Sequence, residues 1–183
     1  VQNMECFRSQ FAICRGRGGV RRAPWGLGAV LFISNMPRYY LMDHIPHHDE
    51  RRYQHRAGHH RGQQVWEYLC FLVALRLWKE FWADRKVAIT IRSDNLAALF
   101  LGAQMKFKAF PLIAKEVALE YSDSSFDPPV FEHVPGISNT LADKLSRIHE
   151  PGANNAVPDE LRDVMPAAAP LRNKGYYGIL ATA

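Results

Sequence analysis

One long apolar segment lies between shorter strand-like segments and constrains the fold most strongly. Apolar side chains recur every three or four residues along Gln63–Trp82, a spacing that predicts a long, largely buried helix. Before it, the continuous apolar run Leu27–Ser34 is typical of a buried strand, and Arg38–Asp43 is its expected hairpin partner. The helix is therefore expected to follow a pair of strands.

The second half of the chain continues the alternation of strands and helices. We expect strands at Lys86–Arg92 and Val130–Val134, and helices at Asp94–Gly102, Pro111–Tyr121 and Ser138–His149. The order strand, strand, helix, strand, helices, strand, helix predicts an α/β fold, in which helices flank a mixed sheet.

The remaining segments lack such patterns. Residues 1–23 are rich in glycine and arginine and are predicted to be irregular, and residues 44–62 are expected to form a polar loop. From Pro151 onward, four prolines predict an extended segment that docks on another surface. We therefore expect a basic arm at 1–19, a domain at 20–148 and a C-terminal tail at 149–183.

Charge is distributed unevenly along the chain. Its 183 residues carry a formal net charge of +5, and no Asp or Glu occurs from Cys6 to Met42, where six arginines stand. An arginine-rich, acid-free segment is typical of RNA contact, of a targeting peptide, or simply of a solvated loop.

Cysteine content points to a reducing compartment. The three cysteines, Cys6, Cys14 and Cys70, form no CxxC pair, which disfavours a zinc site or a disulfide framework. We expect an intracellular location, with the nucleus and the mitochondrion as candidates. No apolar stretch is long enough to span a membrane, and we expect no membrane partner.

Three carboxylates stand at the ends of predicted elements. Glu67 lies in the long apolar helix, Asp94 follows a strand, and Asp143 lies in the last helix. Carboxylate oxygens are the ligands that Mg²⁺ prefers. Other roles stay open, since Asp94 could cap the following helix, Asp143 could lie on a solvated helix face, and His133 could be a satisfied strand-end histidine.

Four motifs in this order resemble the ribonuclease H fold, and most closely the ribonuclease H domain that follows reverse transcriptase in retroelements. They are Ala23–Leu31 (APWGLGAVL), Gln63–Glu67 (QQVWE), Arg92–Asn95 (RSDN) and His133–Arg147 (HVPGISNTLADKLSR). The resemblance covers about residues 20–148.

The resemblance implies two-metal hydrolysis of the RNA strand of an RNA–DNA hybrid, with two Mg²⁺ ions about 4 Å apart. Glu67, Asp94 and Asp143 would be the metal ligands, and His133 would assist proton movement or product release. The residues expected to contact nucleic acid are Arg15, Arg17, Arg21, Arg22, Asn95 and Asn139.

One ligand of this family is missing. An Asp that bridges both ions precedes the Pro-Trp-Gly motif in the family, and counting back from Pro24 places its position at Arg21. No acid lies between Glu5 and Asp43, so a shifted alignment does not supply it. Arg21 would instead neutralise Glu67 or Asp94, and the glycine-rich Ile13–Gly19 predicts an eroded first strand.

These observations predict a catalytically inactive ribonuclease H-like domain of retroelement origin. It would bind RNA or an RNA–DNA hybrid, or serve as a structural subunit of a ribonucleoprotein such as an organellar ribosome, with protein partners on the arm and the tail. The alternatives are an active Mg²⁺-dependent hybrid nuclease and an interaction domain without nucleic-acid contact.

Six histidines, all between residues 44 and 60, invite a metal hypothesis. They are interleaved with arginines and joined by no cysteine, which favours a polar loop near phosphates instead. The histidines are His44, His47, His48, His55, His59 and His60.

Overall fold

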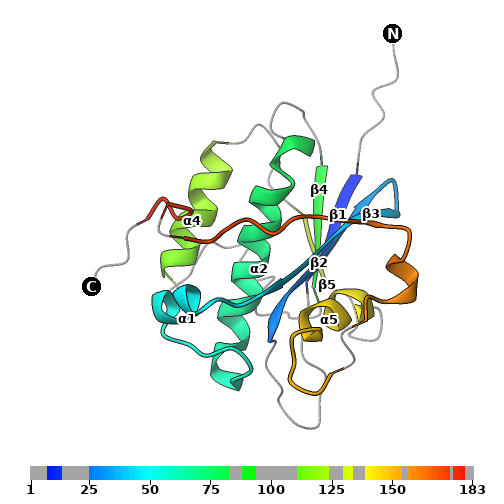
Figure 1. Ribbon diagram of the computed structural model, residues 1–183. Coiled ribbons are helices and arrows are strands. Elements are labelled where there is room, and N and C mark those ends of the chain that lie inside the picture. Colours follow the sequence, from blue (N-terminus) through cyan, green and yellow to red (C-terminus); the bar gives the residue numbers. More distant parts are fainter. Residues whose placement is uncertain are drawn as a thin grey trace.

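The chain folds into a mixed sheet with helices on both faces, as the sequence predicts (Figure 1). The computed structural model describes residues 8–13, 25–82, 88–93, 111–123, 130–133, 139–153, 156–173 and 175–179. The strands are β1 (Arg8–Ile13), β2 (Gly26–Ile33), β3 (Met36–His44), β4 (Ala88–Ser93), β5 (Val130–His133) and β6 (Met165–Pro166). The helices are α1 (His47–Tyr53), α2 (Gln63–Leu77), α4 (Pro111–Ser122) and α5 (Thr140–Arg147), with 3-10 turns η1 (His60–Gly62), η2 (Lys79–Phe81) and η3 (Asp159–Leu161).

The six strands lie in the order β5-β4-β1-β2-β3-β6. β1 runs parallel to β4, which in turn runs parallel to β5, while β2 is antiparallel to both β1 and β3. The predicted hairpin of β2 and β3 is confirmed. Its turn residues Ser34 and Asn35 have φ of 53° and 63°, as the tight turn of a two-residue hairpin requires.

Helix α2 is the centre of the larger core. Eleven of its residues are buried, because the sheet covers one side of the helix and α4 the other (Figure 1). Trp66, Trp78 and Trp82 lie in this core at 2% exposure or less. The opposite face of the sheet carries α5 and a smaller core of Val30, Tyr40, Leu145, Ile148 and Leu161. In the part of the chain described, no helix has the length and apolar character of a membrane span.

Helix α5 approaches the sheet most closely at Gly28 in β2. A Cβ at this position would lie 2.4 Å from the Ala142 carbonyl oxygen and 2.6 Å from the Ser146 backbone nitrogen. On the other face, the Cys70 thiol of α2 donates a hydrogen bond to the Gly28 carbonyl at 3.4 Å. Gly28 therefore brings both helices onto the same point of β2.

We expect Gly28→Ala to lower the free energy of unfolding by about 1–3 kcal/mol, because overpacking forces backbone shifts. Denaturant unfolding measures this change. Gly175→Ala is the matched control, since the nearest atom to its added Cβ is the Asn173 Oδ1 at 3.5 Å. Equal unfolding midpoints for the two variants would contradict close packing at Gly28.

Three details of the sequence prediction are wrong. The irregular arm predicted at 1–19 contains β1, which lies at the centre of the sheet, where strands on both sides supply hydrogen-bond partners.

The loop predicted at 44–62 contains α1 and η1. α1 has acids in its first turn and arginines in its last, an order that suits the helix dipole. The long helix ends at Leu77, before η2. The helix expected at Asp94–Gly102 lies outside the described residues.

The described part of the C-terminal tail docks on the chain's own domain. β6 pairs with β3, and the tail then crosses to the side of α1 and α4 (Figure 1). Arg172 is 5% exposed there. Its guanidinium donates to Asp49 at 2.6 Å, to Asp43 and to the His44 carbonyl at 2.8 Å.

Candidate nucleic-acid site

The three parallel strands β1, β4 and β5 end level with one another, so their carboxyl ends lie side by side. Ile13, Ser93 and His133 are the last residues of β1, β4 and β5, and Ser93 is the register partner of both others. In α/β sheets, ligands bind beyond the carboxyl ends of the parallel strands. His133 is exposed at this end of β5.

Glu67 and Asp143 lie on helices that pack on opposite faces of the sheet at Gly28. Ile13 pairs with Ala29, so Gly28 stands one residue beyond the end of β1. Glu67 lies three residues before the Cys70 that bonds to Gly28, and Asp143 follows the Ala142 that packs on Gly28. His133, the third described residue of the predicted catalytic set, lies at the end of β5.

Glu67 is a buried carboxylate. It is 3% exposed, and the Gln63 side chain, one turn earlier in α2, donates to it at 3.3 Å. Burial raises the pKa of the neighbouring Tyr68, and the charge of Glu67 adds to this effect. Burial also raises the pKa of the Cys70 thiol to about 12, so this cysteine is not a reactive thiolate.

Asp143 is held by an arginine of its own helix. Arg147 donates from Nε to the Asp143 Oδ1 at 2.9 Å, and its Nη1 lies 3.7 Å from Glu150. Arg147 was not among the predicted site residues, although the i, i+4 spacing of the two charges is a signal for this pair. Asn139, expected to contact nucleic acid, is 2% exposed at the N-cap of α5.

The other predicted site residues lie outside the described residues, and their roles stay predictions. They are Asp94, Arg21, Arg15, Arg17, Arg22 and Asn95. β1 ends at Ile13, eight residues before Arg21, so the position of the missing Asp is not fixed by the structure. Within the described ranges, no group of three His, Cys, Asp or Glu residues could hold a metal ion.

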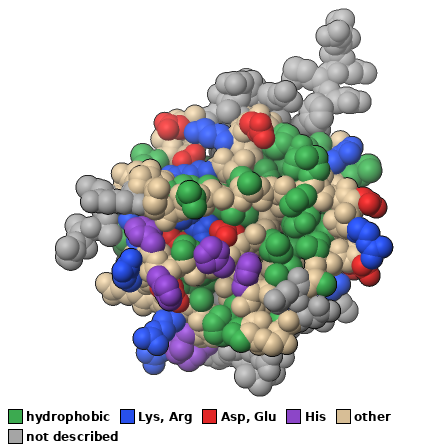
Figure 2. All heavy atoms as spheres, viewed as in Figure 1, with side chains coloured by type: hydrophobic (Ala, Val, Ile, Leu, Met, Phe, Trp, Pro, Cys, Tyr) green, Lys and Arg blue, Asp and Glu red, His purple; other side chains and the backbone are tan. Residues whose placement is uncertain are grey.

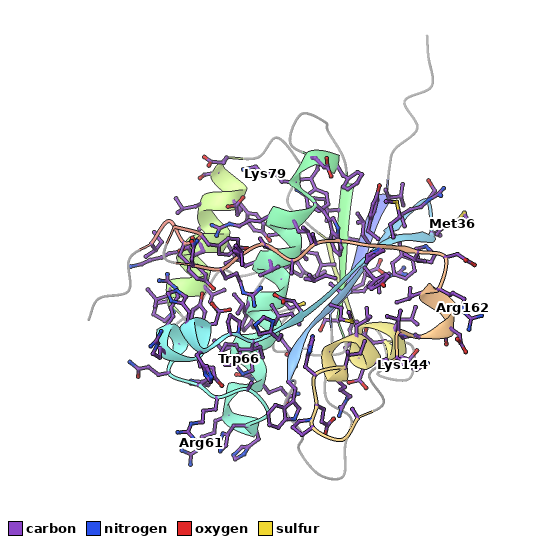
Figure 3. The ribbon with its side chains drawn as sticks, in the orientation of Figure 1. Met36, Arg61, Trp66, Lys79, Lys144 and Arg162 are labelled. Atoms are coloured by element: carbon purple, nitrogen blue, oxygen red, sulfur yellow. The ribbon has the colours of Figure 1, made fainter. Side chains whose placement is uncertain are left out.

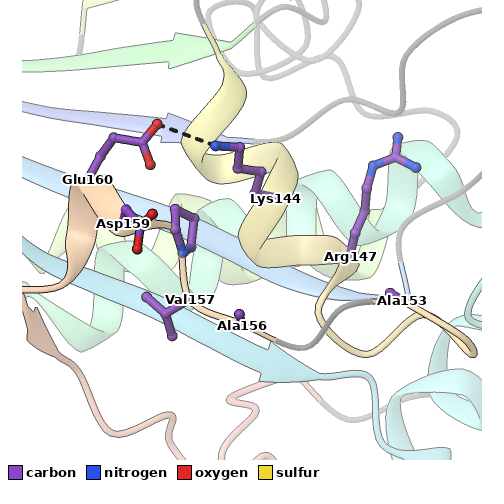
Figure 4. Close-up of a pocket in the computed structure, with 8 residues that line it drawn as sticks. Lys144, Arg147, Ala153, Ala156, Val157, Asp159 and Glu160 are labelled. Carbon is purple, nitrogen blue, oxygen red and sulfur yellow. Dashed lines mark hydrogen bonds and ion pairs between the residues drawn. The ribbon is translucent and has the colours of Figure 1, made fainter.

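A hollow lies beside the C-terminal half of α5, where the chain turns toward η3 (Figure 4). It has a volume of about 530 Å³. Two of the residues that line it form an ion pair, with the Lys144 Nζ 3.3 Å from the Glu160 Oε1. Neither Glu67 nor Asp143 lines it. Arg147, the partner of Asp143, does line it.

No protein-family model matches the sequence, and no curated protein matches it. Solved structures do match the fold. Ribonuclease H1 from the archaeon Halobacterium salinarum is 18% identical with a TM-score of 0.56, over 80% of this chain and 98% of that one. LC11 ribonuclease H1, isolated from compost by a metagenomic approach, is 18% identical with a TM-score of 0.55, over 78% and 93%.

The same LC11 enzyme in complex with an RNA/DNA hybrid matches at 16% identity and a TM-score of 0.51, over 81% of this chain and 96% of that one. Each of these proteins is matched along nearly its whole length. The chain therefore has the ribonuclease H-like fold.

Proposed function

We propose that the chain is a nucleic-acid-binding ribonuclease H-like domain that does not cleave RNA. One observation carries the loss of cleavage. Residues 6–42 contain no Asp or Glu, and this segment includes β1, β2 and everything between them. No residue of β1, or of the segment that follows it, can therefore supply a carboxylate ligand at the strand ends.

Magnesium does not fit the described residues as a two-metal pair. Mg²⁺ takes hard oxygen ligands in near-octahedral geometry. Of the predicted ligands, the structure describes Glu67 and Asp143, and Arg147 already neutralises the latter. With Asp94, the set would hold three carboxylates and still lack the one that bridges both ions.

Binding is supported by the exposed His133 at the end of β5, by the net charge of +5, and by the hybrid-bound structure of a protein with this fold. A basic surface is what the phosphate backbone requires. Retroelement origin and a place in a ribonucleoprotein belong to the same proposal. They rest on the four sequence motifs and on the basic composition.

An active hybrid nuclease is the second candidate. It is favoured because Glu67, Asp94, His133 and Asp143 all persist in the sequence. A ligand supplied by a partner, or a single-metal mechanism, would be needed in place of the missing Asp.

The test measures binding and Mg²⁺-dependent cleavage of an RNA–DNA hybrid by the native chain, by Arg21→Asp and by Cys14→Asp. Cys14 is included because it follows the last residue of β1. We expect the native chain to bind the hybrid without cutting it. We expect one substitution to restore cleavage, because it returns an acid to the site.

The outcomes separate the candidates. Cleavage restored by one variant identifies the position of the lost ligand and shows that the others remain in place. Cleavage by the native chain that is abolished by Asp94→Asn would establish the active nuclease instead. A native chain that binds no nucleic acid would refute the proposed function altogether.

A further inference from the structure

A cationic surface covers α1, η1 and the segment between them. We call it the histidine–arginine surface. In Figure 2, histidine side chains gather on this part of the molecule with Lys and Arg side chains at their border. Its exposed histidines and arginines are His47, Arg51, Arg56, His59, His60 and Arg61.

The acids of this segment do not oppose its charge. Residues 44–64, all of which the structure describes, contain only two acids, Asp49 and Glu50. Asp49 is fully buried and bound to Arg172 and Tyr177. Glu50 accepts the Ala57 backbone N–H at 2.9 Å and lies 2.7 Å from the His47 Nδ1. Neither carboxylate of residues 44–64 is fully exposed.

The surface is held in place by the core, in contrast to a loose polar loop. Trp66 donates from its indole nitrogen to the Arg56 carbonyl at 3.4 Å. Gly58, at φ +70°, lies against the ring of Trp25, so that a Cβ there would stand 2.3 Å from the ring atoms. A surface fixed before binding loses less conformational entropy when a ligand arrives.

The histidine–arginine surface also leads directly to the candidate site. η1 ends at Gly62 and α2 begins at Gln63, whose side chain bonds to Glu67. Arg61 projects outward beside η1, and Trp66 lies at the helix behind it (Figure 3). A nucleic-acid strand at the strand ends could therefore continue across this surface.

We propose that the histidine–arginine surface binds the phosphate backbone of a nucleic acid, and that its affinity rises as pH falls through the range in which histidine gains a proton. This inference rests on the proposed function and adds to it a second contact region with its own pH dependence. Arginine supplies planar, permanently charged donors that match phosphate oxygens. Each phosphate contact releases counterions, so affinity falls with salt.

Neighbouring groups link the charge on the histidines to binding. The rings of His59 and His60 lie 4.4 Å apart, so two positive charges there repel each other. The Nδ1 of His59 accepts the Arg61 backbone N–H at 3.3 Å, and Arg61 adds a third cation. The Nδ1 of His47 lies 2.7 Å from the Glu50 Oε2. A bound phosphate would offset the repulsion between cations at this point.

The test is fluorescence anisotropy of a labelled RNA–DNA hybrid with the full chain, at several salt concentrations and between about pH 8 and about pH 6, where histidine titrates. For the double variant Arg56→Gln/Arg61→Gln we expect the salt slope to fall by about two, since two phosphate contacts are lost. For His59→Gln/His60→Gln we expect near-native affinity at the higher pH and a reduced gain on acidification.

Arg162→Gln is the control variant. Arg162 is also exposed but lies on the other side of the molecule from Arg61, paired with Asp159 at 2.6 Å (Figure 3). It should leave both the salt slope and the pH dependence unchanged. All substitutions are at exposed side chains, and thermal unfolding verifies that each variant is folded.

The outcomes distinguish this inference from the proposed function. If the native chain binds the hybrid while both double variants keep its salt slope and pH dependence, the histidine–arginine surface is not a contact and the proposed function stands. If the native chain binds no hybrid at any pH tested, both fail. Effects confined to the two double variants establish the surface.

Discussion

Arg172→Met is expected to lower the free energy of unfolding by about 3–5 kcal/mol, the cost of removing one partner from a buried ion pair. The Arg172 side chain is 1% exposed, and its two acidic partners, Asp43 and Asp49, are 13% and 0% exposed. Without the guanidinium, both carboxylates stay buried without their cation. Denaturant unfolding monitored by tryptophan fluorescence measures the loss.

The neighbours of Arg172 explain the size of this effect. Burial alone would lower the pKa of its guanidinium, but Asp49 and Asp43 outweigh burial, and the net shift is upward. Tyr177 donates to the second oxygen of Asp49 at 2.6 Å, and burial raises the pKa of this phenol. The network ties the tail to β3 and α1, so its loss should also expose the tail to proteolysis.

Arg162→Met is the matched control. Arg162 and Asp159 form an ion pair of 2.6 Å, but the two side chains are 74% and 86% exposed. Exposed pairs contribute about 0–1 kcal/mol. If both variants lost stability equally, the burial of Arg172 would not be the source of its effect.

The contact between Arg172 and its acids shows what the sequence could not predict. The amphipathic pattern of α5 and the apolar runs of β2 and α2 identify these elements, because a local period reveals which side chains are buried. Arg172 lies 123 residues from Asp49 in the chain, and no local pattern connects them. The proline content predicted an extended tail but not the surface that it covers.

β1 shows a second limit. Its sequence RSQFAI is short, and glycines and arginines follow it, so local propensity did not predict a strand. Pairing with β2 on one side and β4 on the other forms it, and strand preference depends on such neighbours more than on composition.

The candidate site was more accessible to prediction. Glu67, Asp143 and His133 were identified from motif spacing, and the sheet register places His133 beside Ser93 at the strand ends. Motif spacing could not show that Arg172 forms an ion pair with Asp43, which is the first acid after the acid-free segment 6–42. This ion pair commits Asp43 to the structural network that holds the tail.

Glu116 is the centre of a second buried network. It is fully buried in α4, and its two oxygens meet Arg52 at 3.3 Å and Arg76 at 2.8 Å. They also accept the backbone N–H groups of Gly178 at 3.0 Å and Ile179 at 2.8 Å. Burial alone would lower the pKa of Arg76, but Glu116 and Glu120 raise it on balance. One carboxylate thus joins α1, α2, α4 and the tail.

We expect Glu116→Gln to lower the free energy of unfolding by about 3–5 kcal/mol, because an amide of the same size leaves Arg52 and Arg76 without their shared charge. Glu132→Gln is the control, since Glu132 pairs with Arg92 at 2.9 Å but is 46% exposed, and its loss should cost at most about 1 kcal/mol. Limited proteolysis provides a second measurement. Glu116→Gln should expose residues 175–179 to cleavage because their backbone donors lose a charged acceptor. Native-like stability together with a protected tail would show that Glu116 does not hold the tail in place.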